Sequence, residues 1–182
     1  MWAGLDLAAS SHRPSAIAVG DHWNTLSVET VFEDEAIIAC LRGASIVWVD
    51  APLTAGETAF RDCDRRLHAE GIMPLPLTWR SMRTLHQRAV ALRSLTPFSE
   101  WRETFPWSVY LWLGAKRGQK KEPTLLASWA QRNGFTGHPA SEHEWDAVAC
   151  WAIGWLHQMG GVQCIQGTEG TVWIPARKSS YL

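Results

Sequence analysis

The 182-residue chain has little of several things that would narrow its class at once. Its formal net charge is −1, so the molecule as a whole has no long-range attraction for nucleic acid or acidic membranes, and a polyanion would have to be held locally. Its four cysteines show no paired metal-type spacing, and a disulfide framework is not expected. No charged-then-apolar leader opens the chain, and the longest apolar stretch, near residues 147–156, is broken by Gly154 and too short to span a bilayer. We therefore expect a cytoplasmic protein with no membrane segment.

The composition favours one globular domain over residues 1–182. The chain is 46% hydrophobic and long enough for a full core, and nothing in it requires a second domain. It carries twelve tryptophans, most of which we expect in the core, while some could offer stacking faces or mediate a homodimer.

One stretch, residues 44–53 (ASIVWVDAPL), organises the rest of the chain. Its short apolar run, 46–49, is typical of a strand buried on both faces of a sheet. Asp50 follows, and Pro52 ends the strand because proline has no N–H to give to a ladder. Ligands of open α/β sheets bind outside the carboxyl ends of strands, so Asp50 is placed for chemistry. The alternative is that Asp50 only caps the next turn.

Two further acids stand at predicted strand ends. Residues 1–7 read as a strand with Asp6 near its end, and 99–105 read as a strand with Glu103 before a proline, as Asp50 is. Between them, 15–20 and 25–32 are predicted as antiparallel neighbours joined by a turn at 21–24. The pattern therefore predicts an α/β fold on a mixed sheet, with a single edge strand at 172–175.

Helical spacing predicts a crossover helix at 33–42 and two more helices at 58–70 and 81–95. The last two are interpreted as an insertion, or cap, above the Asp50 strand end. The charges at 61–66 form possible pairs three or four residues apart, which favours a solvated and mutually paired face. Shorter helices are expected at 107–113 and 123–131.

The last long helix begins with a capping box, in which Ser141 is the N-cap and Glu144 reaches back. Asp146 has no such structural role. It lies on a mostly apolar stripe that should face the sheet, with His143 one turn earlier on the same side. A buried acid of this kind requires a cation, or else is helped only by the helix dipole and a hydrogen bond.

Basic residues gather in two places that could contact phosphates. Lys116, Lys120 and Lys121, together with Arg117, form a local cluster in a loop, and Arg83 and Arg88 lie on the predicted helix 81–95. Such charges contact a nucleic-acid backbone or are simply solvated.

The acids Asp6, Asp50, Glu103 and Asp146 suit a hard divalent cation such as Mg²⁺ or Mn²⁺, which takes carboxylate oxygens together with substrate phosphate oxygens. Like charges raise one another's pKa values, so gathering them without a cation would be unfavourable. Two ions could activate a water and stabilise the leaving oxygen of a phosphodiester.

Taken together, the chain resembles the predicted ribonuclease H-like nucleases catalogued as domain of unknown function 429, and more distantly the Holliday-junction resolvases. The resemblance covers nearly the whole chain and runs through GLD (4–6), VDAPL (49–53), RDCDRRLHAEG (61–71), ETFP (103–106), HEWDAVACW (143–151) and EGTVWIP (169–175). It implies a ribonuclease H-like fold: a central mixed five-stranded sheet, flanking helices, and a carboxyl-terminal helix that completes a metal site.

Carried over by position, the resemblance implies Asp6 and Asp50 as central metal ligands, Asp146 as the helix ligand and His143 as a ligand or general acid/base. Glu103 matches an acidic residue in the sequence pattern of that family. We therefore expect a Mg²⁺-dependent nuclease that hydrolyses phosphodiester bonds. The alternative is a non-catalytic module on the same fold that binds nucleic acid or protein. An ATP-handling relative is disfavoured, because the turn after Asp6 lacks a glycine-rich phosphate hairpin and the chain is too short for two lobes.

Overall fold

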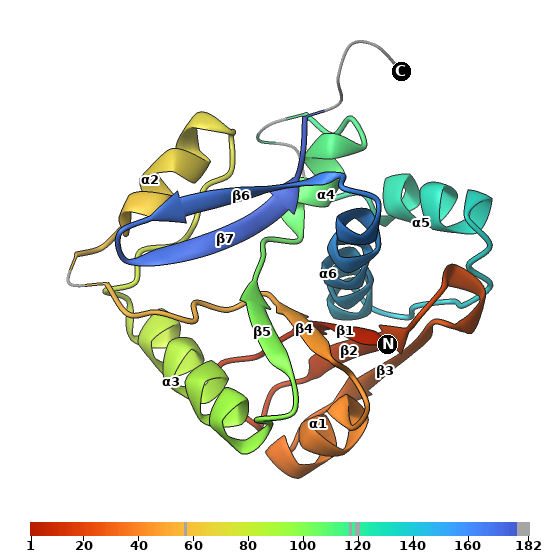
Figure 1. The fold of residues 1–182 in the computed structure, drawn as a ribbon, viewed down its shortest axis with the longest axis horizontal. Coiled ribbons are helices and arrows are strands. Elements are labelled where there is room, and N and C mark those ends of the chain that lie inside the picture. The colour runs from red at the N-terminus through yellow and green to blue at the C-terminus, as the bar shows by residue number, and fades with distance from the viewer. Residues whose placement is uncertain (57, 117, 119–120, 178–182) are drawn as a thin grey trace.

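The computed structural model describes residues 1–56, 58–116, 118 and 121–177, and its α/β fold is built on a mixed five-stranded sheet (Figure 1). The strands are β1 (Trp2–Asp6), β2 (Ser15–Gly20), β3 (Ser27–Val31), β4 (Ile46–Val49), β5 (Glu100–Glu103), β6 (Val162–Gly167) and β7 (Gly170–Pro175). The helices are η1 (Trp23–Thr25, 3₁₀), α1 (Asp34–Leu41), α2 (Asp62–Ala69), α3 (Arg80–Leu95), α4 (Trp107–Trp112), α5 (Pro123–Arg132) and α6 (Glu142–Gln158). Within these described ranges, no helix combines the length and apolarity needed to cross a membrane.

The sheet has the strand order β3-β2-β1-β4-β5. β2 pairs antiparallel with both β1 and β3, while β4 pairs parallel with both β1 and β5. The parallel register places Leu5 beside Val49 and Val49 beside Glu103. Because parallel strands end at the same edge of a sheet, the tips of β1, β4 and β5 lie side by side. The prediction of a mixed five-stranded sheet is confirmed.

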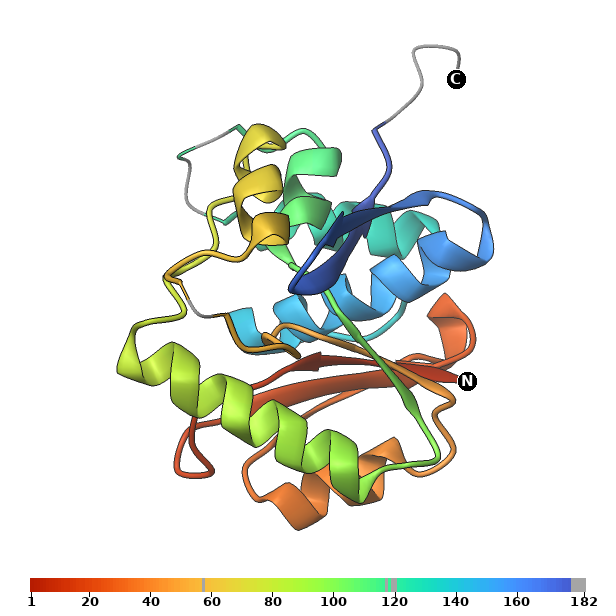
Figure 2. The same cartoon turned by 60° about the vertical axis from the view of Figure 1, so that its left-hand side comes forward.

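Helices cover both faces of this sheet (Figure 2). Leu5 and Val49 pack into the core shared with α1 and α3, whereas Trp48 packs into the core shared with α6. Successive residues of a strand point to opposite faces. Asp6 and Asp50 are an even number of residues from Gly4 and Trp48, so their side chains belong to the face that α6 covers.

Helix α6 lies directly on β1, and Gly4 is the point of closest approach. A Cβ built on Gly4 would lie 2.2 Å from Trp151 N and 2.3 Å from Ala147 O, which no side chain can occupy. The indole of Trp2, two residues earlier in β1, donates to Trp151 O at 3.0 Å and so holds the same residue of α6. The absence of a side chain at Gly4 therefore lets α6 bring its first turns to the tip of β1.

The carboxyl-terminal segment differs from the prediction of a single edge strand at 172–175. β6 and β7 form a separate antiparallel hairpin that lies across the α6 side of the sheet (Figure 1). An isolated bridge joins Thr104, just after β5, to Trp173 of β7, and Thr104 Oγ1 donates to Trp173 O at 2.7 Å. Polar residues interrupt β6 (VQCIQG), so its sequence carries a weak strand signal.

The two helices between β4 and β5 are found, and the first half of α3 lies beside the Asp50 strand end, where His86 Nδ1 is 2.9 Å from Pro52 O, but its second half crosses the sheet. Ala89 and Leu92 are fully buried against the sheet face opposite α6, beside α1. A parallel connection from β4 to β5 needs a crossover, and α3 supplies it. α2 alone remains on the other side, packed against the β6–β7 hairpin.

Candidate functional site

The ends of β1 and β4 bring two carboxylates side by side. Asp6 is the last residue of β1, Asp50 follows β4 directly, and Asp50 N donates to Leu5 O at 2.9 Å. Burial raises the pKa of the Asp50 carboxyl well above its usual range, and the charges of Asp6 and Asp146 raise it further. The structure thus places these three predicted acids in one electrostatic cluster.

Asp146 reaches this cluster from the second turn of α6. The residue is 5% exposed, and its Oδ2 accepts a hydrogen bond from Lys121 Nζ. Its Oδ1 is buried and has no hydrogen-bond partner in the described part of the chain. Burial raises the pKa of Asp146 to about 6, against the opposing effect of Lys121. One oxygen of this carboxylate is therefore desolvated without compensation.

Within the described part of the chain, Lys121 is a cation in direct contact with this cluster. Burial lowers the pKa of its ammonium, but Asp146, Asp50 and Asp6 together raise it above its ordinary value. We predicted Lys121 as a contact to nucleic acid. Its side chain is instead 27% exposed and directed to Asp146, so it acts first on the acids of this same chain.

His143 joins the cluster from the first turn of α6. Its Nδ1 lies 2.7 Å from Asp6 Oδ2, and its side chain is 55% exposed. Burial raises the pKa of Asp6, and the hydrogen bond from His143 opposes that rise. When Nδ1 of a neutral imidazole donates its proton to a carboxylate, Nε2 carries no proton and is the hydrogen-bond acceptor. The spacing of His143 and Asp146 therefore delivers both side chains to the strand tips, as the sequence predicted.

The donor chemistry of the cluster fits a hard divalent cation, although its present spacing does not enclose one. Among the residues that the structure describes, no three carboxylate, imidazole or thiol groups are close enough together to hold a metal ion. Burial and mutual repulsion nevertheless raise the pKa values of all three acids, Lys121 compensates them only in part, and Asp146 Oδ1 has no partner among the described residues. Buried carboxylates whose ionised form a further cation would stabilise are ligands that Mg²⁺ and Mn²⁺ take.

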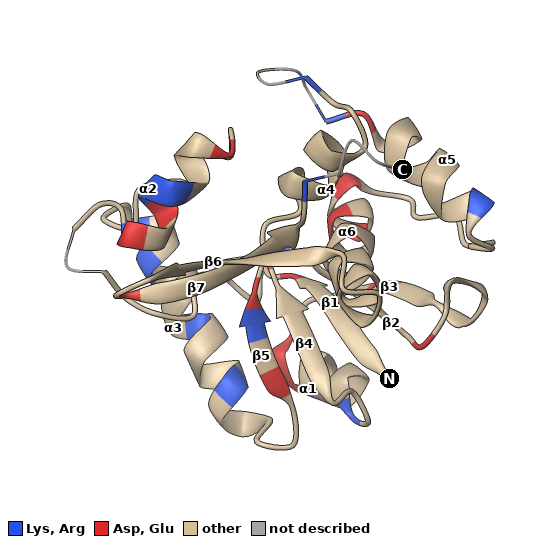
Figure 3. Ribbon diagram, turned by 45° about the horizontal axis from the view of Figure 1, so that its top comes forward, with Lys and Arg blue, Asp and Glu red and all other residues tan. Residues whose placement is uncertain are grey.

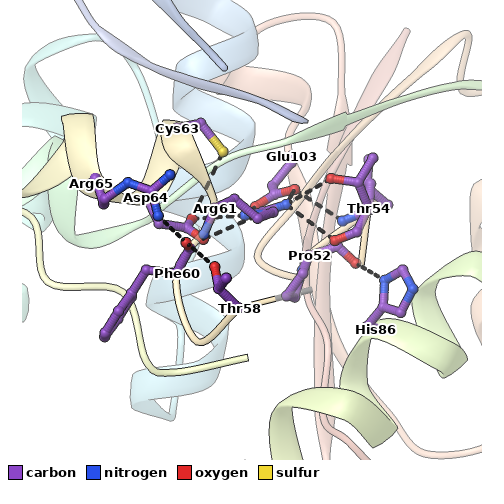
Figure 4. Close-up of polar contacts among 11 residues, drawn as sticks. Pro52, Thr54, Thr58, Phe60, Arg61, Cys63, Asp64, Arg65, His86 and Glu103 are labelled. Carbon is purple, nitrogen blue, oxygen red and sulfur yellow. Dashed lines mark hydrogen bonds and ion pairs between the residues drawn. The ribbon is translucent and has the colours of Figure 1, made fainter. Parts of the chain in front are cut away.

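Glu103 stands apart from the other acids. Its carboxylate accepts from Arg61 Nη2 at 2.5 Å, from Arg61 Nη1 at 2.8 Å and from Leu53 N at 2.9 Å (Figure 4). Glu103 shares the register of Leu5 and Val49, so its side chain belongs to the sheet face opposite Asp6 and Asp50. Its charge still raises the pKa of Asp50, but its contacts make it a residue that positions the 51–54 loop.

The interpretation of a solvated charged face on α2 is wrong for Arg61 and Asp64. These residues are 1% and 2% exposed, and the Arg61 guanidinium lies between Asp64 and Glu103. Asp64 Oδ2 also accepts from Arg61 N at 2.8 Å, which caps the helix. A signal was present: Asp64 precedes Leu67 by three residues, so it lies on the buried stripe of the helix.

The other predicted basic contacts are dispersed, and Figure 3 shows Lys and Arg positions along α2 and α3. Arg88 is held inside the fold by Asp34 at 2.7 Å and by the carbonyls of Ala8 and Phe32. Arg83 lines a cavity between α3 and residues 54–56. Lys116 lies in the loop that leads to Lys121, and Arg117 and Lys120 fall outside the described residues.

Comparison with protein-family models, with curated proteins and with solved structures finds no match to this chain. The family resemblance therefore stays a prediction, and the function must be argued from the site itself.

Proposed function

We propose that this protein is a metal-dependent phosphodiesterase that hydrolyses nucleic acid, on a ribonuclease H-like fold. One observation carries the proposal: Asp6, Asp50 and Asp146 come from two parallel strand tips and a crossing helix, and their charges act on one another and on a single ammonium. Gathering desolvated carboxylates in this way destabilises a fold unless a cation compensates them. Their position outside the carboxyl ends of the strands is where open α/β sheets bind ligands.

The residues take distinct roles in this proposal. Asp6, Asp50 and Asp146 would hold Mg²⁺ or Mn²⁺. A bound divalent ion supplies activation of a water and stabilisation of the charge that develops on the phosphate. His143, oriented by Asp6 through Nδ1, presents Nε2 to accept or return a proton at the solvent-exposed edge of the site. Lys121 balances the acids before substrate arrives and, among the described residues, is a cation at the site that could contact a phosphate oxygen.

The test is cleavage of a panel of single-stranded, duplex, hybrid and branched substrates with Mg²⁺, with Mn²⁺ and with EDTA. We expect metal-dependent cleavage that Asp6→Asn and Asp146→Asn each reduce by at least a hundredfold. Asp62→Asn is the matched control, because Asp62 is a carboxylate paired with the exposed Arg66. Cleavage that survives both site substitutions would show that the activity comes from elsewhere.

The spacing of the acids gives specific support to one alternative, a non-catalytic module that binds nucleic acid or protein. Lys121 already neutralises part of the cluster, and the described residues do not hold three metal ligands at coordinating distance. This alternative predicts binding that is independent of divalent ions, weakens with salt if the partner is nucleic acid, and yields no cleaved product. A homodimer and a cytoplasmic location also stay predictions, the first of which analytical ultracentrifugation can test.

A further inference from the structure

A small cavity opens beside Asp6 and Asp50 that the proposed chemistry does not use. It has a volume of about 190 Å³ and lies between the strand tips, α2 and α3. Both carboxylates border it. Most of its remaining wall is apolar and comes from Pro52, Leu75, Leu77, Met82, Leu85 and Phe105. An apolar recess whose mouth carries the candidate catalytic acids has the composition of a ligand site.

The size of the recess limits its occupant to one ring system. An apolar cavity of about 150 Å³ is large enough to hold one benzene molecule, and drug-sized ligands need about 300 Å³ or more. At about 190 Å³, this recess therefore accommodates a single flat heterocycle. Leu75 lines it from a loop and Met82 from α3, so a bound ring would contact apolar side chains of two different segments.

The charged wall of the recess excludes an anion. Arg61, Asp64 and Glu103 border the cavity, and every N–H of the Arg61 guanidinium is already donated to Asp64, to Glu103 or to Thr54 (Figure 4). This wall thus offers acceptors but no guanidinium donor. A phosphate is therefore disfavoured inside the recess and would need the cation proposed at Asp6 and Asp50 to hold it at the mouth, while a neutral ring could enter.

A second, more open cavity of about 500 Å³ also borders Asp50. Asp50 and Phe105 border both cavities, and Trp107 and Lys121 line the second. A nucleic-acid strand bound at Asp50 would therefore have the recess beside it, and next to the recess the second cavity with an aromatic and a cationic side chain. Aromatic and cationic side chains along a path are typical of single-strand binding.

We propose that the recess binds one unpaired nucleobase, so that the substrate is single-stranded or locally unpaired at the nucleotide beside the scissile phosphate. This inference rests on the proposed function, because it uses the acids at the mouth as the phosphate end of the site. A base inside a duplex cannot reach a recess of this kind without leaving its stack.

The experiment measures binding apart from cleavage. The probes are short single strands of DNA and of RNA that carry one 2-aminopurine, whose fluorescence rises when the base leaves its neighbours, with Ca²⁺ in place of Mg²⁺. Met82→Trp fills the recess, and Leu75→Trp fills it from a loop position that is half exposed. Thr84→Trp is the matched control, because it adds the same side chain to an exposed position on α3. Thermal unfolding of each variant identifies any that fails to fold.

We expect a fluorescence rise with the wild-type protein, and about tenfold weaker binding for both recess variants but not for Thr84→Trp. Replacing the probe nucleotide by an abasic one should weaken wild-type binding by a similar factor. Equal binding of abasic and normal strands, or recess variants that bind as the wild type does, would overturn the inference. So would duplex probes that bind as tightly as single strands.

Cleavage separates this inference from the proposed function. If the wild type cuts normal and abasic strands equally well, the recess has no role as a base site while the phosphodiesterase stands. If no strand is cut but the recess variants lose binding and fluorescence, the base site stands and the proposed phosphodiesterase fails.

Discussion

Replacing Lys121 by methionine should make the protein bind divalent cations more tightly. The substitution keeps most of the length and apolar surface of the side chain and removes its ammonium. That ammonium donates to Asp146 and compensates Asp6 and Asp50, so an incoming metal ion has to compete with it. The Lys121 ammonium therefore stabilises the metal-free protein and opposes the binding of a metal ion.

The structure sets the size of the effect. The Lys121 side chain is 27% exposed and that of Asp146 is 7% exposed, so their contact is partly shielded from water. A hydrogen bond between charged groups contributes about 1.5–3 kcal/mol in such surroundings. If metal binding must break this contact, its prior removal should tighten binding by about 10–100-fold, since about 1.4 kcal/mol is a factor of ten. Without metal, Lys121→Met should lower the free energy of unfolding by a similar amount.

Isothermal titration calorimetry with Mn²⁺ and Mg²⁺ measures the affinity, and urea denaturation in EDTA measures the stability of the metal-free protein. Lys121→Arg is the matched control, because it keeps the positive charge and should keep the weaker metal affinity. Asp146→Asn should reduce metal binding in either background, which ties the measured heat to this site.

The reasoning would be refuted if Lys121→Met bound metal more weakly than the wild type, or with the same affinity. Weaker binding would mean that Lys121 supports the metal-bound arrangement and does not oppose it. Equal affinity would mean that moving the ammonium away from the acids costs no measurable free energy.

Three further predictions follow from other parts of the fold. Gly4→Ala should lower the free energy of unfolding by about 3 kcal/mol, the upper end of overpacking effects, because the new Cβ would lie 2.2 Å from the backbone of α6. A loss under about 1 kcal/mol in urea denaturation would contradict this contact. Glu103→Gln should lower the free energy of unfolding by about 3–5 kcal/mol in urea denaturation, because it leaves the buried Arg61 with one carboxylate in place of two. Unchanged stability would show that Glu103 contributes little to the fold. The pKa of Asp146 is about 6 in the folded state, so between pH 4 and pH 6 the folded protein holds a proton on Asp146 that the unfolded chain has lost. In EDTA, the free energy of unfolding should therefore fall by about 2–3 kcal/mol as the pH rises from 4 to 6. Asp146→Asn should flatten that dependence, and an equal slope in the variant would assign it to other groups.

The sequence was sufficient where local chemistry decides the structure. A short apolar run that ends in Asp50 and Pro52 can form little other than a buried strand that stops there, and β4 ends at Val49. The helix start at Ser141 was equally clear: its Oγ accepts from Glu144 N at 3.2 Å, although the Glu144 carboxylate reaches Ala140 N and not the N-cap itself. These signals involve residues that are adjacent or one turn apart, so no tertiary information is needed to read them.

The sequence was insufficient where a charged side chain has a distant partner. Arg61 pairs with Glu103, 42 residues further along the chain, and Lys121 pairs with Asp146, 25 residues away. Each of these cations also has charged neighbours in sequence, so its local pattern is that of a solvated charge run. Only the tertiary arrangement, which brings the start of α2 to Glu103 and the first turns of α6 to the strand tips, distinguishes a buried ion pair from an exposed one.

Glu103 shows how finely strand register separates the two kinds of acid. Asp50 precedes its proline by two residues and Glu103 precedes Pro106 by three, so the similarity between the two motifs conceals a shift of one residue. In the parallel ladder Thr104 N donates to Val49 O, as Asp50 N donates to Leu5 O, so Thr104, which directly follows β5, corresponds to Asp50, which directly follows β4. A shift of one residue moves a side chain to the other face of a sheet. Glu103 therefore turns towards Arg61, and the position that could have carried another acid of the site is occupied by a hydroxyl that holds the β6–β7 hairpin.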